Sequence, residues 1–175
     1  MDTDPRTTPQ ALAEFNRFYS TLHVGEVIAA HPGFVSASRF ELVEGDLGTG
    51  PRWLAIYGMQ DEAAAEQYVK DNARPWLHRR HYSPWPAARK KAKTVWRMLW
   101  RQLSSAGSTG DTLYIVGTNA PNGSDVAVAR LELYREFAHP APGCPRFCEI
   151  GATPSAQDNE PVWRLRYRLI PGTHE

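Results

Sequence analysis

The spacing of hydrophobic residues divides the chain into one long helical segment and several extended ones. Between Pro9 and Ala30 the apolar residues recur every three to four positions, which predicts a helix that His31-Pro32-Gly33 would end. The extended segments that follow are bounded by glycine or proline. We predict strands at Phe34 to Val43, Arg52 to Met59, Thr112 to Thr118 and Trp163 to Leu169. The glycine-rich stretch between the first two strands, Gly45 to Gly50, is expected to be a hairpin loop.

The last predicted strand alternates between large apolar residues and arginines. The two sets are Trp163, Leu165, Tyr167 and Leu169, and Arg164, Arg166 and Arg168. Alternation with a period of two is typical of a strand with one buried face in an antiparallel sheet. We therefore expect an α+β fold whose sheet has a dry side and a side that faces water or an anion.

Two motifs recur with the same offset of 110 positions, which suggests an old duplication. The first is Pro32-Gly33, which recurs as Pro142-Gly143. The second is Pro51-x-Trp53-x-x-x-Tyr57, which recurs as Pro161-x-Trp163-x-x-x-Tyr167. The same offset aligns Asn16 to Ile28 with Val126 to Ala138, so the latter is predicted to be helical, with Ser124 or Asp125 as its cap.

These patterns suggest a single domain of residues 1–175 made of two strand-helix-strand-strand halves, each half of a ferredoxin-like arrangement. Half-repeat 1 would cover about 1–60 and half-repeat 2 about 111–172. A helical insertion at about 61–104, with helices at Asp61 to Asn72 and Ala87 to Ser104, and a linker at 105–110 would lie between them. The first half lacks a convincing opening strand, because Asp2 to Thr7 is polar and contains a proline.

Composition and charge narrow the classes of partner. With 42% hydrophobic residues the 175-residue chain can bury a core, and 20 basic against 19 acidic residues give a formal net charge of +1, so a nucleic-acid partner is not expected. No apolar run is long enough to span a membrane, and the polar N-terminus does not resemble a signal peptide, which favours a cytoplasmic protein. Cys144 and Cys148 are interpreted as reduced thiols.

Four polar residues form the best candidate site. Asn16, Tyr19, His23 and Glu26 are spaced to share one row along the first helix. A histidine at the border of a buried face can transfer protons near neutral pH, so His23 and Tyr19 are predicted to be catalytic, and Asn16 and Glu26 to bind substrate. The alternative is that Tyr19 covers the edge of the core while His23 and Glu26 are solvated. The position equivalent to His23 is Leu133, so the site would exist in one half only.

The residues around this row resemble a known family. Asn16 to Val27, followed by Pro32-Gly33-Phe34 and Arg39-Phe40, is similar to the EthD-like branch of the dimeric α+β barrel proteins, although Gly25 stands where that family often has proline. The resemblance implies a ferredoxin-like barrel that encloses a pocket for a small organic molecule, as a pseudo-dimeric monomer or a homodimer. It also implies cofactor-independent oxygenase, lyase, isomerase or cyclase chemistry, with haem binding in some branches.

Four aromatic residues in the repeated motif, Trp53, Tyr57, Trp163 and Tyr167, would either line that pocket as substrate-binding residues or pack beneath the helices. The segment from Arg74 to Arg101 is basic and rich in tryptophan, and its charges, including Arg97 and Arg101, could contact an anion. It therefore supports an alternative function as a non-catalytic binding or interaction module. No metal site is expected, since His78 and His81 match no ligand pattern.

Overall fold

The computed structural model describes ten segments of the chain. They are residues 1–3, 7–45, 50–73, 82–86, 92–94, 96–107, 110–121, 127–137, 143–153 and 161–171. These segments form two helices and a strongly curled antiparallel sheet of seven strands, so the predicted α+β class is confirmed. None of the helices in the described segments is long and apolar enough to cross a membrane.

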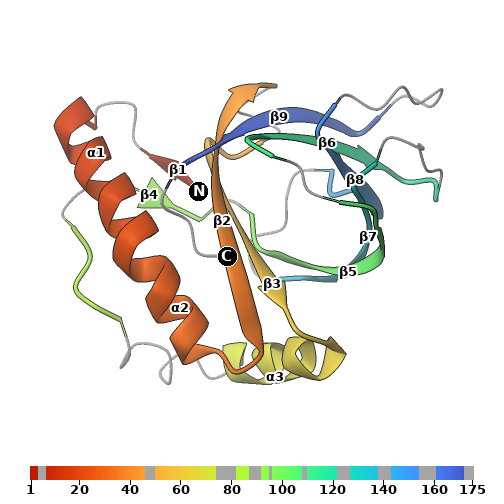
Figure 1. The fold of residues 1–175 in the computed structure, drawn as a ribbon, viewed down its shortest axis with the longest axis horizontal. Coiled ribbons are helices and arrows are strands. Elements are labelled where there is room, and N and C mark those ends of the chain that lie inside the picture. The colour runs from red at the N-terminus through yellow and green to blue at the C-terminus, as the bar shows by residue number, and fades with distance from the viewer. Residues whose placement is uncertain are drawn as a thin grey trace. The chain divides into compact units, whose positions relative to one another are not determined.

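The first helix is continuous from Pro9 to Ala30 and changes its winding on the way (Figure 1). Its three parts are α1 (Pro9–Phe18), the π-helical segment η1 (Tyr19–His23) and α2 (Val24–Ala30). Thr8 caps the start, because its Oγ1 accepts a hydrogen bond from the Ala11 N–H at 3.3 Å. The chain leaves the helix at Gly33, whose φ of +85° is costly for any residue with a Cβ atom. The predicted helix is thus confirmed, but its π segment was not foreseen.

The second helix, α3 (Glu62–Asn72), confirms the helix predicted from Asp61. The Asp61 carboxylate accepts a hydrogen bond from the Ala64 N–H at 2.8 Å and so satisfies one of the free donors of the first turn. Ala64 packs closely on the turn that follows α2. A Cβ atom added at Gly33 would lie 2.3 Å from the Ala64 Cβ, so no side chain fits between this turn and α3.

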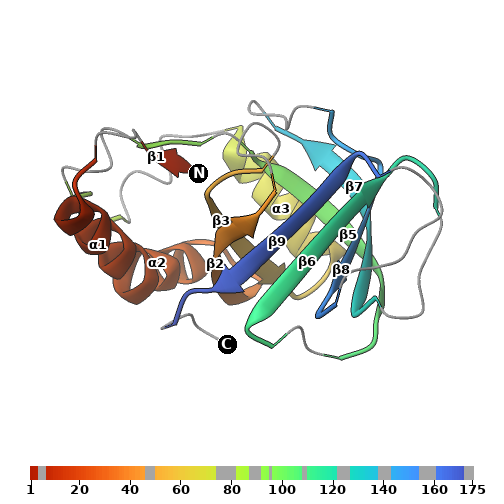
Figure 2. The ribbon, with the colours of Figure 1, turned by 90° about the horizontal axis from the view of Figure 1, so that it is seen from above.

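The strands that were predicted from alternation and apolar runs are all present. They are β2 (Phe34–Glu44), β3 (Trp53–Met59), β6 (Thr112–Thr118) and β9 (Trp163–Leu169). The remaining strands of the sheet are β5 (Met98–Ser105), β7 (Ala129–Glu136) and β8 (Phe147–Gly151). The strand order is β3-β2-β9-β6-β8-β7-β5, and Figure 2 shows β9, β6, β8, β7 and β5 following one another along a curved surface. Two short strands outside this sheet, β1 (Asp2–Thr3) and β4 (Ala92–Lys93), complete the set.

Two predicted helices are wrong. The region predicted as an amphipathic helix from Ala87 to Ser104 contains β4 and β5, and residues 87–91 and 95 lie outside the described segments. The region predicted to be helical by the repeat, Val126 to Ala138, contains β7. These two regions pair with each other as antiparallel strands, with Arg101 opposite Glu132. The second half-repeat therefore has no helix in the part of the chain that the structure describes.

The described chain forms two compact units. The β-rich unit comprises Met1–Asp2, Phe40–Leu54 and Thr94–Leu169, and the helical unit comprises Thr3–Arg39, Ala55–Lys93 and Ile170–Glu175. In the β-rich unit Trp163, Leu165 and Tyr167 of β9 are buried, while Arg164 and Arg168 are exposed, which confirms the predicted alternation. In the helical unit Phe15 and Val24 are fully buried.

Candidate functional site

The π segment η1 positions the two residues that were predicted to be catalytic. Tyr19 and His23 are its first and last residues, and both are buried. A π turn interrupts the usual backbone hydrogen bonds of a helix, and side chains then donate hydrogen bonds to carbonyl groups of the preceding turn. The Thr21 hydroxyl donates to the Arg17 carbonyl at 2.8 Å, and Arg39 Nη1 donates to the Asn16 carbonyl at 3.1 Å.

His23 lies in a box of aromatic side chains. Its imidazole is 4.2 Å from the Trp85 ring and 4.9 Å from the Tyr19 ring, measured between centroids. The ring of Tyr82 contacts it edge-on at 5.1 Å, and Phe18 lies parallel to it at 6.3 Å. Only 8% of His23 is exposed, so the alternative of a solvated His23 is not what the structure shows.

Glu26 supplies the negative charge beside His23. Its Oε2 lies 3.6 Å from His23 Nδ1, and its Oε1 accepts a hydrogen bond from the Ser83 N–H at 2.8 Å. Burial by itself would raise the pKa of Glu26, but the hydrogen bond from Ser83 and the nearby His23 outweigh it, and the pKa is lowered. Glu26 therefore stays ionised near neutral pH and can stabilise a protonated His23.

Arg39 of β2 is the most buried charged residue of the helical unit, with 1% of its surface exposed. Its guanidinium group donates to Ser20 Oγ at 2.8 Å and to Asn16 Oδ1 at 3.0 Å, and it lies over the Tyr19 ring at 4.1 Å. No carboxylate of the described residues forms an ion pair with it. Burial lowers the pKa of Arg39 to about 10, which leaves the group cationic at neutral pH.

Tyrosine hydroxyl groups gather near this cation. The Tyr57 hydroxyl is buried, and no described atom forms a well-aligned hydrogen bond with it. Burial raises the pKa of Tyr57, and so does Tyr19, whose hydroxyl acts on Tyr57 both through charge and as a hydrogen-bonding neighbour; Tyr82 adds to this effect, while Arg39 acts in the opposite direction. The Tyr82 hydroxyl in turn lies 3.3 Å from His31 Nε2. Of the substrate-binding residues predicted from sequence, the structure thus brings Asn16, Glu26 and Tyr57 into one neighbourhood with Tyr19 and His23.

The other three predicted pocket residues belong to the β-rich unit. Trp163 is stacked on Trp96 with 4.3 Å between ring centroids, and the Tyr167 hydroxyl donates to the Pro51 carbonyl at 3.0 Å. Trp53 is buried and carries the guanidinium group of Arg52 over its ring at 4.8 Å. Each of the three thus has a packing role in its own unit.

The predicted anion contacts Arg97 and Arg101 lie on the surface of the β-rich unit. Arg97 lies over the Phe137 ring at 5.1 Å and Arg101 over the Tyr134 ring at 5.2 Å. Arg101 is on β5, so the predicted helical row of charges does not form. On β9, Arg166 and Arg168 are 3.2 Å from carboxylates of Glu44 and Glu41, as expected for the wet face of a sheet.

Two further kinds of site, a reactive thiol and a metal centre, find no support in the described residues. Cys144 and Cys148 are free thiols, and burial raises the pKa of Cys144 to about 11 and that of Cys148 further, which makes both poor nucleophiles. No group of three potential metal ligands occurs in this part of the chain, and His78 and His81 lie outside it.

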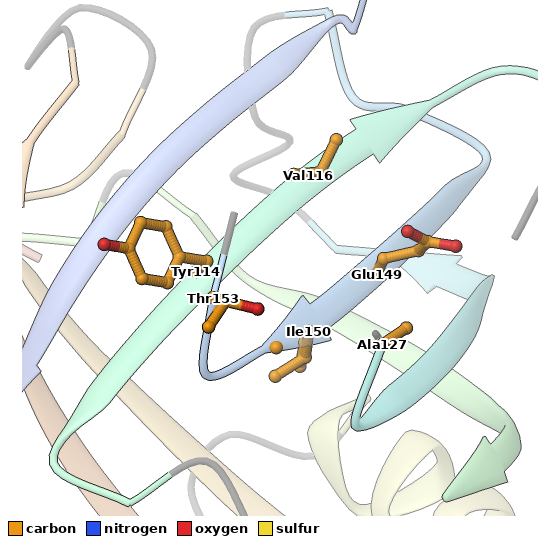
Figure 3. Close-up of a pocket in the computed structure, with 7 residues that line it drawn as sticks. Tyr114, Val116, Ala127, Glu149, Ile150 and Thr153 are labelled. Atoms are coloured by element: carbon orange, nitrogen blue, oxygen red, sulfur yellow. The ribbon is translucent and has the colours of Figure 1, made fainter. Parts of the chain in front are cut away.

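Two surface hollows are outlined by the described residues, and neither includes His23. One, of about 330 Å³, is open to solvent and is lined by Glu14, Arg17, Phe18, Thr21, Leu22 and Pro86. The other is a small depression in the β-rich unit, where Tyr114 and Val116 of β6 lie beside Glu149 and Ile150 of β8 (Figure 3). Because Phe18 contacts both Trp85 and His23, the first hollow lies next to the aromatic box.

The roles of Arg39, Tyr82 and Trp85 were not predicted from the sequence. The available signal for Arg39 was a charged residue in the middle of a strand, next to Phe40 and two positions after Ala37, both of which are buried. The role of Tyr82 and Trp85 depends on a long-range return of the chain onto η1, which no local pattern encodes. Comparison of the chain with protein-family models, with curated proteins and with solved structures finds no match.

Proposed function

We propose that the chain is an enzyme that transfers a proton on a small organic molecule, with His23 as the acid or base and no tightly bound cofactor. The observation that carries the proposal is the pairing of His23 with Glu26 at 3.6 Å, next to a cation and phenol groups. An ionised carboxylate beside an imidazole orients the ring and stabilises its protonated form, which is the form that appears when a base has taken up a proton.

The surroundings suit removal of a proton from a carbon atom beside a carbonyl group. Loss of that proton places negative charge on the carbonyl oxygen, and hydrogen-bond donors in a dry site stabilise such a charge. The hydroxyl of Tyr82, whose ring contacts the His23 imidazole at 5.1 Å, is a donor of this kind, and the Arg39 guanidinium group adds positive charge in the same unit. Lyase, isomerase, cyclase and cofactor-independent oxygenase reactions can all begin with this step, and the reaction type is not narrowed further.

Substrate access requires a change at the segment Tyr82–Pro86. The Trp85 ring lies against the imidazole at 4.2 Å and fills the place that a substrate would occupy. Trp85 and its neighbours are only partly buried, and the adjoining hollow at Phe18 and Pro86 opens to solvent. A substrate that enters from this hollow would displace the Trp85 ring. The ferredoxin-like barrel that the resemblance to EthD-like proteins implies stays a prediction. A barrel of that kind would enclose such a pocket.

The test is solvent deuterium exchange, followed by proton NMR, into small enolisable ketones, 2-oxo acids and 3-oxo acids. Wild type is expected to accelerate exchange on at least one class, and His23→Gln should lower the rate by about 100-fold or more. Glu66→Gln, which removes an exposed carboxylate from α3 of the same unit, is the matched control and should keep the wild-type rate. Retention of the wild-type rate by a folded His23→Gln variant would contradict the proposal.

A further inference from the structure

The interior of the helical unit holds a positive charge that no carboxylate of the described residues pairs with. Arg39 makes three hydrogen bonds, all to neutral oxygen atoms of Asn16 and Ser20. Its Nε–H makes none with the described residues. Buried charges in proteins are usually paired with an opposite charge, because moving an ion out of water is costly. A ligand with a negatively charged group could therefore supply the counter-charge for Arg39.

A second buried donor is available in the same place. The hydroxyl of Tyr57 is shielded from solvent, and its hydrogen-bonding neighbour Tyr19 does not form a well-aligned hydrogen bond with it. An unsatisfied hydroxyl of this kind destabilises the free protein unless something binds it. Strand register places it near the cation. Leu42 of β2 hydrogen-bonds to Arg52, and a Cβ atom at Gly58 of β3 would lie 2.4 Å from Ser36 Oγ, so Tyr57 lies opposite Ala37 and diagonal to Arg39 on the same face of the sheet.

The Tyr19 ring connects the Arg39 guanidinium group to His23, the residue that we propose transfers the proton. The Tyr19 ring contacts the Arg39 guanidinium group at 4.1 Å and the His23 imidazole at 4.9 Å. If the carboxylate of a small molecule bound Arg39, the neighbouring atoms of that molecule would therefore lie about the width of one aromatic ring from His23. The rings of Phe18, Tyr19 and Trp85, which surround His23, would contact an apolar body that follows the anchored group.

We infer that Arg39 and Tyr57 form a seat for the carboxylate group of a small organic acid. A carboxylate can accept hydrogen bonds from the Arg39 Nε–H and from the Tyr57 hydroxyl, and it would neutralise the buried charge. The inference rests on the proposed function and narrows its substrate to organic acids, with the carboxylate held at Arg39 and the reacting carbon directed to His23.

Arg39 also has a structural role, because it holds the Asn16 carbonyl of the π segment. Loss of Arg39 could therefore disturb η1 and weaken ligand binding indirectly. Tyr57 makes no such contact with the backbone, and Tyr57→Phe removes one oxygen atom that makes no well-aligned hydrogen bond with the described residues. This variant should fold at least as well as wild type and so separates ligand binding from structural damage.

The experiment is isothermal titration calorimetry with benzoate, a carboxylate that has no exchangeable proton beside a carbonyl group. Benzyl alcohol serves as the neutral analogue and sulfate as an inorganic anion, all at constant ionic strength. Wild type should bind benzoate, and Arg39→Met and Tyr57→Phe should each weaken it about tenfold or more, as expected for the loss of a hydrogen bond to a charged group. Lys70→Gln, which removes an exposed cation of α3 in the same unit, should bind benzoate like wild type.

The outcomes separate this inference from the proposed function. Absence of benzoate binding to wild type, equal affinity in the Tyr57→Phe variant, or equally strong binding of sulfate or benzyl alcohol would overturn the carboxylate seat. If His23→Gln binds benzoate like wild type and no deuterium exchange is found, the seat stands and the proton-transfer function fails. If exchange depends on His23 while benzoate does not bind, the function stands and the seat fails.

Discussion

Replacement of Gly33 by alanine tests how α3 is packed in the helical unit. Gly33 has a φ of +85°, and left-handed backbone costs a residue with a Cβ atom about 1–2 kcal/mol. The new Cβ would also lie 2.3 Å from the Ala64 Cβ, far below van der Waals contact, so the turn or α3 must move. Overpacking of this kind costs about 1–3 kcal/mol, and the sum predicts a destabilisation of roughly 2–5 kcal/mol.

Urea unfolding, monitored by far-UV circular dichroism, measures the loss of stability. Two further variants separate the contribution of backbone strain from that of close packing. Gly110→Ala is the control for backbone strain alone, because Gly110 has a φ of +61° and no atom within 4 Å of an added Cβ, and it should lose only about 1–2 kcal/mol. Adding Ala64→Gly to Gly33→Ala removes the overlapping methyl group and should recover the packing part as a favourable coupling in a double-mutant cycle. Equal losses for the two alanine variants, together with no coupling to Ala64→Gly, would refute the close packing.

Three further predictions concern pH dependence and buried groups. The folded pKa of Glu26 lies below its usual value of 4.5, so its ionisation stabilises the fold above that pH. The free energy of unfolding of wild type should therefore fall relative to Glu26→Gln as the pH drops below about 4.5, and parallel curves would contradict this. Tyr167→Phe removes the donor to the buried Pro51 carbonyl and should cost about 1–3 kcal/mol in urea unfolding, whereas a neutral effect would exclude that hydrogen bond. Because the pKa of Cys144 is about 11 instead of 9.0, alkylation by iodoacetamide at pH 8 should be about 100-fold slower than that of a free thiol, and a rate like that of free cysteine would be inconsistent with its burial.

Periodicity in the sequence was sufficient for the elements whose pattern and surroundings agree. The alternation on β9 corresponds to the face that is buried. The apolar spacing from Pro9 to Ala30 predicts the helix but only part of its buried face, because Phe15 is buried while Leu22 is exposed. Capping and turn residues such as Asp61 and Gly33 mark the ends of elements because they satisfy a local requirement of the backbone. These features depend on neighbours in the sequence and can be inferred without a fold.

The two wrong helices show where such inference ends. Ala129 to Glu136 alternates between apolar and charged residues, as a strand does, but the repeat offset assigned this segment the helical state of Asn16 to Ile28. The stripe from Ala92 to Leu103 fits helical spacing, yet β5 gains its hydrogen bonds from β7, which is distant in sequence. Long-range pairing overrides a local pattern that is compatible with both states.

Only part of the candidate site was predicted, because only part of it depends on residues that are close in sequence. The row of Asn16, Tyr19, His23 and Glu26 follows from helical geometry, and the structure keeps these residues together. The π segment has no compositional signature, because it depends on an arginine from β2 that reaches back to the helix. Its contribution, and that of the Trp85 ring over His23, emerges only from tertiary packing.

The most direct test of the central claim is a crystal structure of the protein with bound benzoate. We expect the carboxylate within hydrogen-bond distance of Arg39 and the Tyr57 hydroxyl, with its ring beside Tyr19 and directed to His23. The Trp85 ring should then have left its position against the imidazole. Benzoate bound elsewhere, or a site at Arg39 that stays closed and empty at saturating benzoate, would contradict the account.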